Sequence, residues 1–171
     1  LIGDPGGIVD LPKGFSYKAF SRGGETMSDG LLVPWSHDGM AAFPGPGGAT
    51  ILVRNHEMKS SGTGAFGEGN KLLSKIPRSK IYDAGDGKLM HLGGTTTLLY
   101  DTQAGKLLEH HLSLAGTGRN CAGGSTPWGS WITCEEWPVG PGDKDSEGLG
   151  REHGWCFEVP SPAKGLVEPL P

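Results

Sequence analysis

One stretch of the chain, from Arg119 to Glu136, is dense in side chains that could do chemistry. It opens with Arg119-Asn120-Cys121 and continues through glycines, and a neighbouring guanidinium favours the thiolate form of a cysteine. Glycines beside the cysteine allow the backbone to approach a bound ion closely. The stretch ends in the paired carboxylates Glu135 and Glu136. A thiolate and two carboxylates form a candidate metal-ligand set, although a glycine-rich turn with an inert, buried cysteine fits the same spacing.

A second polar cluster, Arg54-Asn55-His56-Glu57, directly follows the apolar run from Ala49 to Val53. Polar side chains at the end of a strand are well placed to line the mouth of a pocket. Asn55 can donate a hydrogen bond to a phosphate oxygen, and Glu57 can bind a hard cation. The same pattern also fits an ordinary strand end at the surface.

The order of the acidic residues limits which of them can share a site. Neighbouring residues in a strand point to opposite faces, so Glu135 and Glu136 meet one site only where the strand ends or bulges. Four aspartates, Asp83, Asp86, Asp143 and Asp145, could contact calcium, but none of them lies in an EF-hand loop. We therefore expect them to be turn residues.

Short strands are the elements expected to position these side chains. The 171 residues include 31 Gly and 13 Pro, which punctuate short apolar runs as in a turn-rich all-β protein. Helical signal is confined to Asn70–Lys80, where Pro77 interrupts it. Strands are predicted at Phe15–Phe20, Gly39–Phe43, Thr50–Arg54, Thr95–Asp101, Lys106–Leu114, Ser130–Glu135 and Gly154–Val159.

The spacing of these strands leaves room for part of a β-propeller. Ser130–Glu136 and Gly154–Val159 each place a Trp and a Cys within a strand, which suggests a faint blade repeat. A blade takes roughly 40–50 residues, so the chain has room for about three, and a closed propeller needs more. We therefore expect residues 1–171 to be the incomplete, N-terminal part of a single propeller domain, inactive by itself.

The charge and hydropathy of the chain limit the classes of partner that it can bind. The net charge is −4 and basic residues are scattered, which argues against nucleic-acid binding. No apolar stretch approaches the ~18 residues of a membrane span. An odd number of cysteines leaves at least one outside any disulfide within the chain, and Cys134 and Cys156 can pair only if their strands are neighbours.

Four motifs occur in the order seen in PhoX-type alkaline phosphatases, which the chain resembles over roughly residues 30 to 160. The stretch from Asn120-Cys121-Ala122 to Cys134-Glu135-Glu136, which contains the last two motifs, is long and specific. The resemblance implies a six-bladed propeller, a cluster of iron and calcium ions, and export to the periplasm or outside the cell. The motifs are Arg54-Asn55-His56-Glu57, Gly93-Gly94-Thr95-Thr96-Thr97, Asn120 to Ser130 and Thr133-Cys134-Glu135-Glu136.

The resemblance also assigns roles. It implies that Cys121 binds iron and that Glu57, Glu135 and Glu136 are further metal ligands and catalytic groups. Asn55 is similar to a phosphate-contacting position, and Arg119 lies near the phosphate by neighbourhood alone. This chain has Gly123-Gly124 where well-known members have Asn-Gly, which indicates a sister branch of the family.

The expected function is therefore metal-dependent hydrolysis of small phosphomonoesters, because clustered cations neutralise a phosphate dianion and its leaving alkoxide. Carboxylates suit calcium, and a thiolate suits iron. Two alternatives stay open, a non-catalytic propeller stabilised by calcium and a propeller lactonase. We expect a monomer.

Overall fold

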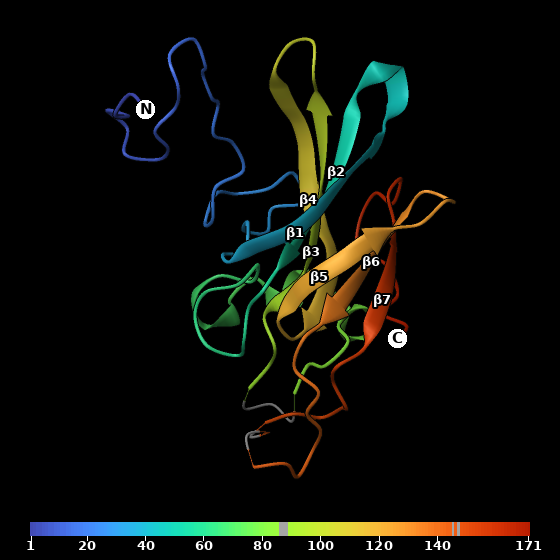
Figure 1. Ribbon diagram of the computed structural model, residues 1–171. Coiled ribbons are helices and arrows are strands. Elements are labelled where there is room, and N and C mark those ends of the chain that lie inside the picture. The colour runs from blue at the N-terminus through green and yellow to red at the C-terminus, as the bar shows by residue number, and fades with distance from the viewer. Residues whose placement is uncertain (86–88, 145, 147) are drawn as a thin grey trace.

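The structure is a computed structural model that describes residues 1–85, 89–144, 146 and 148–171. Its strands form two antiparallel sheets that lie side by side, with β1 contacting β5 where the sheets meet (Figure 1). The first sheet contains β1 (His37–Pro44), β2 (Thr50–His56), β3 (Gly93–Asp101) and β4 (Lys106–Thr117) in that order. The second contains β5 (Asn120–Ser125), β6 (Ser130–Glu135) and β7 (Cys156–Pro160), also in chain order.

The predicted all-β class is confirmed, and the arrangement is that of a partial propeller. Each sheet is an antiparallel meander in chain order, as in a propeller blade of four strands. The first sheet has all four strands, and the second has three within the described residues. The described residues form these two sheets, where about three blades were expected.

The N-terminal segment accounts for much of that difference. Residues 1–36 form only the isolated bridges Ile2↔Leu11 and Thr26↔Leu32, and the predicted strand Phe15–Phe20 is absent from this described segment. Phe15 is 72% exposed, so no neighbouring sheet buries its side chain. The expected helical region around Asn70–Lys80 also differs. It contains the short 3-10 turns η2 (Glu68–Asn70), η3 (Leu73–Lys75) and η4 (Arg78–Lys80), and a further turn, η1 (Pro46–Gly48), joins β1 to β2.

The glycine-rich segment after Asn120 is absent from the predicted strands, and this was wrong. It forms β5, which pairs with β6 from Asn120↔Glu135 to Ser125↔Trp131. Low strand propensity is overridden here by close pairing. A Cβ at Gly123 would lie 2.2 Å from the carbonyl oxygen of Ile132, so only glycine fits this approach.

The supposed blade repeat is also corrected. Ser130–Glu136 and Gly154–Val159 supply two neighbouring strands of one sheet, β6 and β7, and not equivalent strands of two blades. Their pairing sets Cys134 opposite Cys156. Alternate residues of both strands are buried, with Trp131 and Val159 facing the interior.

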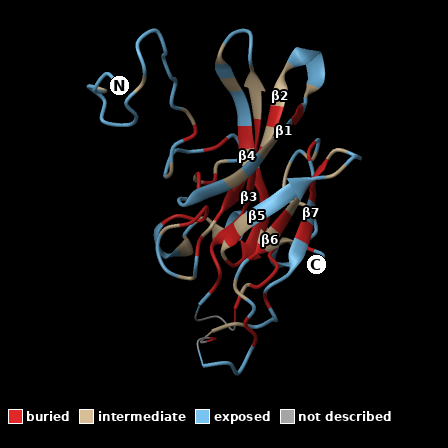
Figure 2. Cartoon of the chain, in the orientation of Figure 1, coloured by how far each residue is buried: buried red, intermediate tan, exposed pale blue. Residues whose placement is uncertain are grey.

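The buried apolar side chains form two clusters. One cluster lies between the two sheets and includes strand residues of both, where Figure 2 shows buried residues in red. The other packs the segment before β1 and the connection between β2 and β3 against β4. Fully burying one large apolar side chain contributes ~1.5–3 kcal/mol, so the inter-sheet cluster fixes how the two sheets pack against each other. The inter-sheet cluster consists of Phe43, Ile51, Val53, Tyr82, Leu114, Trp131, Phe157 and Val159.

Among the described residues, no helix has the length and apolar character needed to cross a membrane. Asp143 accepts a hydrogen bond from the amide of Gly140 over 2.8 Å, as expected of a turn residue. Asp86 and Asp145 lie outside the described residues.

Candidate metal centre

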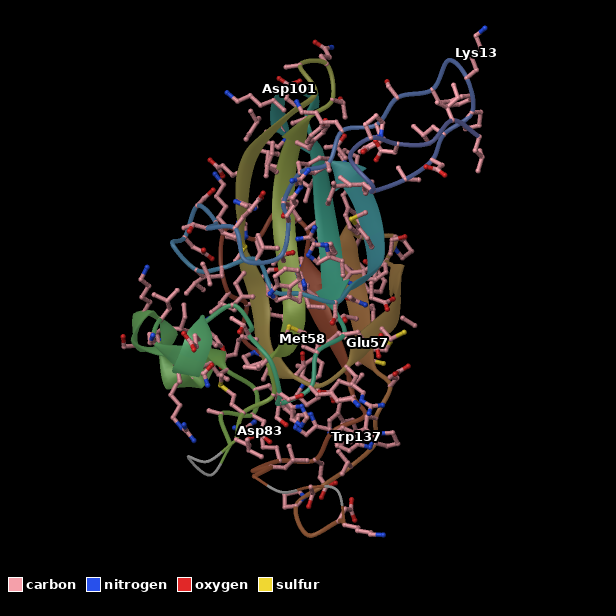
Figure 3. The ribbon with its side chains drawn as sticks, turned by 90° about the vertical axis from the view of Figure 1, so that its left-hand side faces the viewer. Lys13, Glu57, Met58, Asp83, Asp101 and Trp137 are labelled. Atoms are coloured by element: carbon pink, nitrogen blue, oxygen red, sulfur yellow. The ribbon has the colours of Figure 1, made fainter. Side chains whose placement is uncertain are left out.

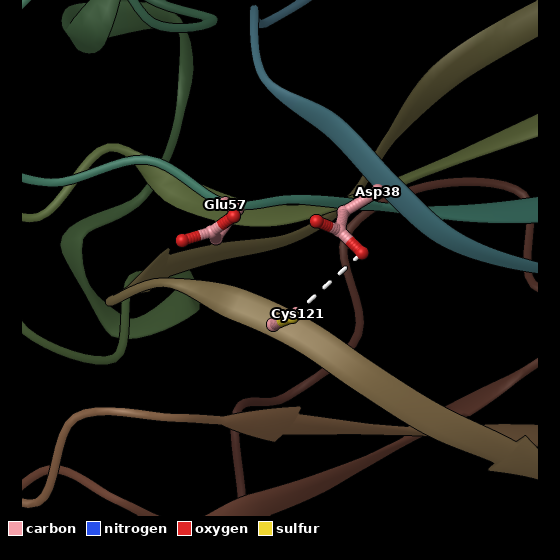
Figure 4. A group of neighbouring side chains, drawn as sticks. All are labelled: Asp38, Glu57 and Cys121. Carbon is pink, nitrogen blue, oxygen red and sulfur yellow. Dashed lines mark hydrogen bonds between the residues drawn. The ribbon is translucent and has the colours of Figure 1, made fainter.

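Three side chains that can bind metals converge where the two sheets meet. Asp38 lies near the start of β1, Glu57 directly follows β2, and Cys121 is the second residue of β5. One ligand atom from each lies within 4.8 Å of the others, and Cys121 Sγ is 3.8 Å from Asp38 Oδ1 (Figure 4). Three separate strands therefore present two carboxylates and a thiol to one small volume.

The buried side-chain amide of Asn55 forms hydrogen bonds between the strands that carry these ligands. Asn55 on β2 donates from Nδ2 to the carbonyl oxygens of Cys121, over 2.7 Å, and Ala122, over 3.0 Å. Its Oδ1 accepts a hydrogen bond from the indole of Trp131 over 2.8 Å. Asn55 is fully buried, so its side chain connects β2 to β5 and β6 and contacts no solvent.

A glycine allows β1 to approach the same place. A Cβ at Gly39 would lie 2.6 Å from the carbonyl oxygen of Cys121 and 3.3 Å from Asn55 Nδ2. Any larger residue would push β1, and with it Asp38, away from Cys121. Gly39 is therefore a steric requirement of the cluster.

The backbone of Arg119 brings a fourth acidic residue to this region. Arg119 has φ of 50°, a left-handed conformation that is uncommon outside glycine. Its amide donates to the carbonyl oxygen of Met58 over 2.9 Å, and its carbonyl accepts from the amide of Glu136 over 3.1 Å. This one residue thus links the segment that follows Glu57 to Glu136. Figure 3 shows Glu57 and Met58 close together near the middle of the molecule, with Trp137 below them.

The side chain of Arg119 places a positive charge next to Glu136. Its Nη1 is 3.9 Å from Glu136 Oε1, and its guanidinium lies over the ring of Trp137, 4.9 Å from the centroid. The Nε of Arg119 is buried and has no hydrogen-bond partner among the described residues. The Arg119 side chain is about a quarter exposed, so an anion can still reach it.

Crowding of acidic groups dominates the electrostatics. Partial burial raises the pKa of Glu57, and the neighbouring carboxylates of Glu136 and Asp38 raise it further. Partial burial also raises the pKa of the Cys121 thiol, with Asp38, Glu136 and Glu57 adding to the effect. The prediction that Arg119 holds Cys121 as a thiolate is therefore wrong. The Arg119 guanidinium stacks on Trp137, and the charged groups that act on the Cys121 sulfur are the carboxylates of Asp38, Glu136 and Glu57.

These residues fit a cation. Charged carboxylates and a thiolate repel one another when they are this close, and a bound cation removes that repulsion. Oxygen donors from Asp38 and Glu57 suit calcium, and the sulfur of Cys121 adds the soft donor that suits iron.

Glu135 has different surroundings from Glu136. Its Oε1 accepts hydrogen bonds from the amide of Gly118, over 2.7 Å, and from His153 Nδ1, over 2.6 Å. Its Oε2 accepts from the amides of Gly154 and Trp155 over 2.8 and 3.1 Å. The side chain is fully buried and both oxygens are occupied. The alternation of β6 thus sends Glu135 inward, while Glu136 stays near the cluster.

His153 completes a buried charge network on this inner side. Its Nε2 lies 3.1 Å from Asp83 Oδ2, and its Nδ1 faces Glu135. Burial alone would lower the pKa of His153, but the hydrogen bonds to Asp83 and Glu135 outweigh it and raise the pKa to about 9. Burial would raise the pKa of Asp83, but hydrogen bonds from His153 and three backbone amides lower it to about 2. Asp83 therefore does more than shape a turn.

Sequence reasoning named Glu57, Cys121 and Glu136, which lie together, and missed Asp38. Asp38 belongs to none of the four sequence motifs, so no local sequence signal marks it as a ligand. Asn55 and Arg119, expected to contact substrate, lie beside the cluster. The amide of Asn55 is taken up by protein hydrogen bonds.

Comparison with known proteins identifies one family. The family model described as Alkaline phosphatase PhoX matches residues 1–109 and 88–171, which together span all 171 residues. No curated protein and no solved structure matches the chain.

Proposed function

This chain belongs to the PhoX alkaline phosphatase family, and from that premise we propose that it contributes metal ligands to an enzyme that hydrolyses phosphomonoesters. The observation that carries the proposal is the convergence of Asp38, Glu57 and Cys121 within 4.8 Å. The substrate class follows from the family, and a small phosphate ester is the expected partner.

Each residue has a proposed role. Cys121 would hold iron through its sulfur, and Asp38 and Glu57 would hold calcium through their carboxylate oxygens. Glu136 completes the acidic set from the end of β6. Glu135 is instead a structural residue, because four hydrogen bonds already occupy its carboxylate.

Bound cations would supply positive charge that offsets the phosphate dianion and the developing charge on the leaving oxygen. Arg119 is the proposed phosphate-binding residue of this chain, because its guanidinium is partly exposed beside Glu136. Stacking on Trp137 restricts the guanidinium to one side of the cluster. Asn55 acts through Cys121 as a positioning residue and does not contact the phosphate.

The test combines metal analysis with assays on two substrates, a phosphate ester and a lactone. The purified full-length protein is expected to contain iron and calcium and to hydrolyse 4-nitrophenyl phosphate. A chelator should abolish the reaction, and adding back the two metals should restore it. Calcium alone, with no phosphomonoester hydrolysis, would overturn the proposal. Hydrolysis of a lactone would then identify a propeller lactonase, and inactivity on every substrate would identify a binding module.

The proposed setting is the periplasm or the cell exterior. Family membership supports this, since it groups the chain with alkaline phosphatases that act outside the cytoplasm. Fractionation of cells that make the full-length protein tests it, with a cytoplasmic enzyme as marker. Recovery in the cytoplasmic fraction alone would contradict the proposal.

A further inference from the structure

Two thiols face each other across the second sheet, apart from the roles proposed above. Cys134 on β6 and Cys156 on β7 are register partners, and their sulfur atoms are 3.0 Å apart. Both are free thiols. Cys156 is exposed and Cys134 is partly buried, so a small reagent in solution can reach the pair.

The strand register places this pair where a disulfide can form. The neighbouring pair, Glu135 and Trp155, is hydrogen-bonded, with the amide of Glu135 donating to Trp155 over 2.9 Å. Hydrogen-bonded and non-hydrogen-bonded pairs alternate along antiparallel strands, so Cys134 and Cys156 form a non-hydrogen-bonded pair. Cα atoms in such pairs are about 4.5 Å apart, which lies within the range that a disulfide spans.

The surroundings hold the two cysteines in this register. Thr133 and Phe157, which flank them on the opposite face, are buried in the interior. The connection between the strands is anchored near its end, where His153 contacts Asp83 and Glu135 and the hydroxyl of Tyr82 donates to Glu152 over 2.6 Å. Bond formation between the sulfurs therefore requires little movement of either strand.

We propose that Cys134 and Cys156 are a redox-active thiol pair that a small-molecule or protein disulfide oxidises to a cross-strand disulfide. In the first step the thiolate of exposed Cys156 attacks one sulfur of the oxidant and releases one thiol. In the second step the sulfur of Cys134 attacks the Cys156 sulfur and releases the other thiol. Two S–H bonds are lost, one S–S bond forms in the protein, and the oxidant is reduced to two thiols that take up the protons.

The bond would close a covalent ring around the connection from Glu136 to Trp155. Such a ring lowers the conformational entropy of the unfolded chain and so stabilises the folded state. It would also hold the end of β6, from which Glu136 reaches the metal cluster. Cys121 is a separate group, since its nearest ligand-type neighbours are Asp38 and Glu57.

The test uses the intact protein, reduced, freed of reductant and then incubated with glutathione disulfide. We expect two of the three thiols of this chain to be lost without a lasting glutathione adduct. Peptide mapping should link Cys134 to Cys156, while Cys121 still reacts with a maleimide. The urea midpoint of the oxidised protein should move to a higher concentration and return after reduction.

Matched variants make the result decisive. Cys134→Ser and Cys156→Ser should each abolish the midpoint shift, and Cys121→Ser should retain it. A stable glutathione adduct on Cys156 with Cys134 still free, or a linkage through Cys121, would overturn the proposal. None of these readouts depends on phosphatase activity, so the proposal can fail or succeed independently of the metal centre.

Discussion

The side chain of Asn55 fixes the backbone of Cys121 across the junction of the two sheets, with Nδ2 donating to the Cys121 carbonyl oxygen over 2.7 Å. The same amide accepts a hydrogen bond from Trp131, so three strands meet at one buried group. The position of the candidate iron ligand therefore depends on a residue that does not itself touch the metal.

Replacing Asn55 tests this dependence. Asn55→Ala leaves the Trp131 indole and two carbonyls without partners, which should destabilise the protein by about 2 kcal/mol. Metal affinity should also fall about 10- to 100-fold, as when outer-shell partners are lost. Urea unfolding and metal titration measure the two effects.

A matched control separates positioning from general damage. Thr95→Val removes the buried contact of 2.8 Å between the Thr95 and Ser113 hydroxyls, which lies on β3 and β4. This variant should be destabilised while its metal affinity stays unchanged. Equal loss of metal affinity in both variants would show that Asn55 has no specific positioning role.

Asp38 is the ligand that sequence reasoning missed, and its removal should change two properties. Asp38→Asn should lower metal affinity about 10-fold or more, because one oxygen donor and its charge are lost. In metal-free protein it should also lower the pKa of Cys121, since Asp38 helps to raise that pKa. The pH dependence of Cys121 alkylation measures this shift. Asp101→Asn, at the other end of the molecule (Figure 3), should change neither property.

Glu135 and Glu136 are adjacent and should respond in opposite ways. Glu136→Gln should weaken metal binding with little effect on stability, because this side chain is nearly half exposed. Glu135→Gln should destabilise the fold by about 3 kcal/mol, since it breaks a buried pair with His153. Metal affinity of Glu135→Gln should stay near that of the wild type. The reverse pattern would restore Glu135 as the metal ligand.

His153 predicts how stability depends on pH. Its pKa is about 9 in the folded protein, above its ordinary value of 6.5. Its charge therefore stabilises the fold fully below pH 6.5, and this contribution is lost as the pH rises through 9. His153→Gln should be clearly less stable than the wild type at pH 6, and the difference should narrow by pH 10. A difference in unfolding free energy that is constant with pH would contradict a charged His153.

Sequence patterns were sufficient for much of the fold. Ser130–Glu135 was predicted with the bounds it has, and the hairpin from Thr95–Asp101 to Lys106–Leu114 corresponds to β3 and β4. These strands have strong local signals, from β-branched residues and turn residues. β5 has none, because its glycines favour a loop locally and become a strand only by pairing with β6.

The candidate site was predicted in part for a similar reason. Glu57 and Cys121 each lie in a motif that the family resemblance assigns to metal binding. The structure brings the two side chains together, as that assignment requires. Asp38 has no such motif, and its place depends on how closely β1 approaches β5 at Gly39. The inward direction of Glu135 depends on the partner His153, which is 18 residues away in sequence. Contacts of this kind follow from three-dimensional packing and not from local pattern.

The most direct test of the metal-centre account is the iron and calcium content of the full-length protein with Cys121 intact and with Cys121→Ala. Cys121 is only partly buried, so the variant should keep the fold and unfold within about 0.5 kcal/mol of the metal-free wild type. We predict that the wild type contains both metals, and that the variant loses its iron together with most of its hydrolysis of 4-nitrophenyl phosphate. A folded Cys121→Ala protein that keeps its iron and its activity would contradict the account.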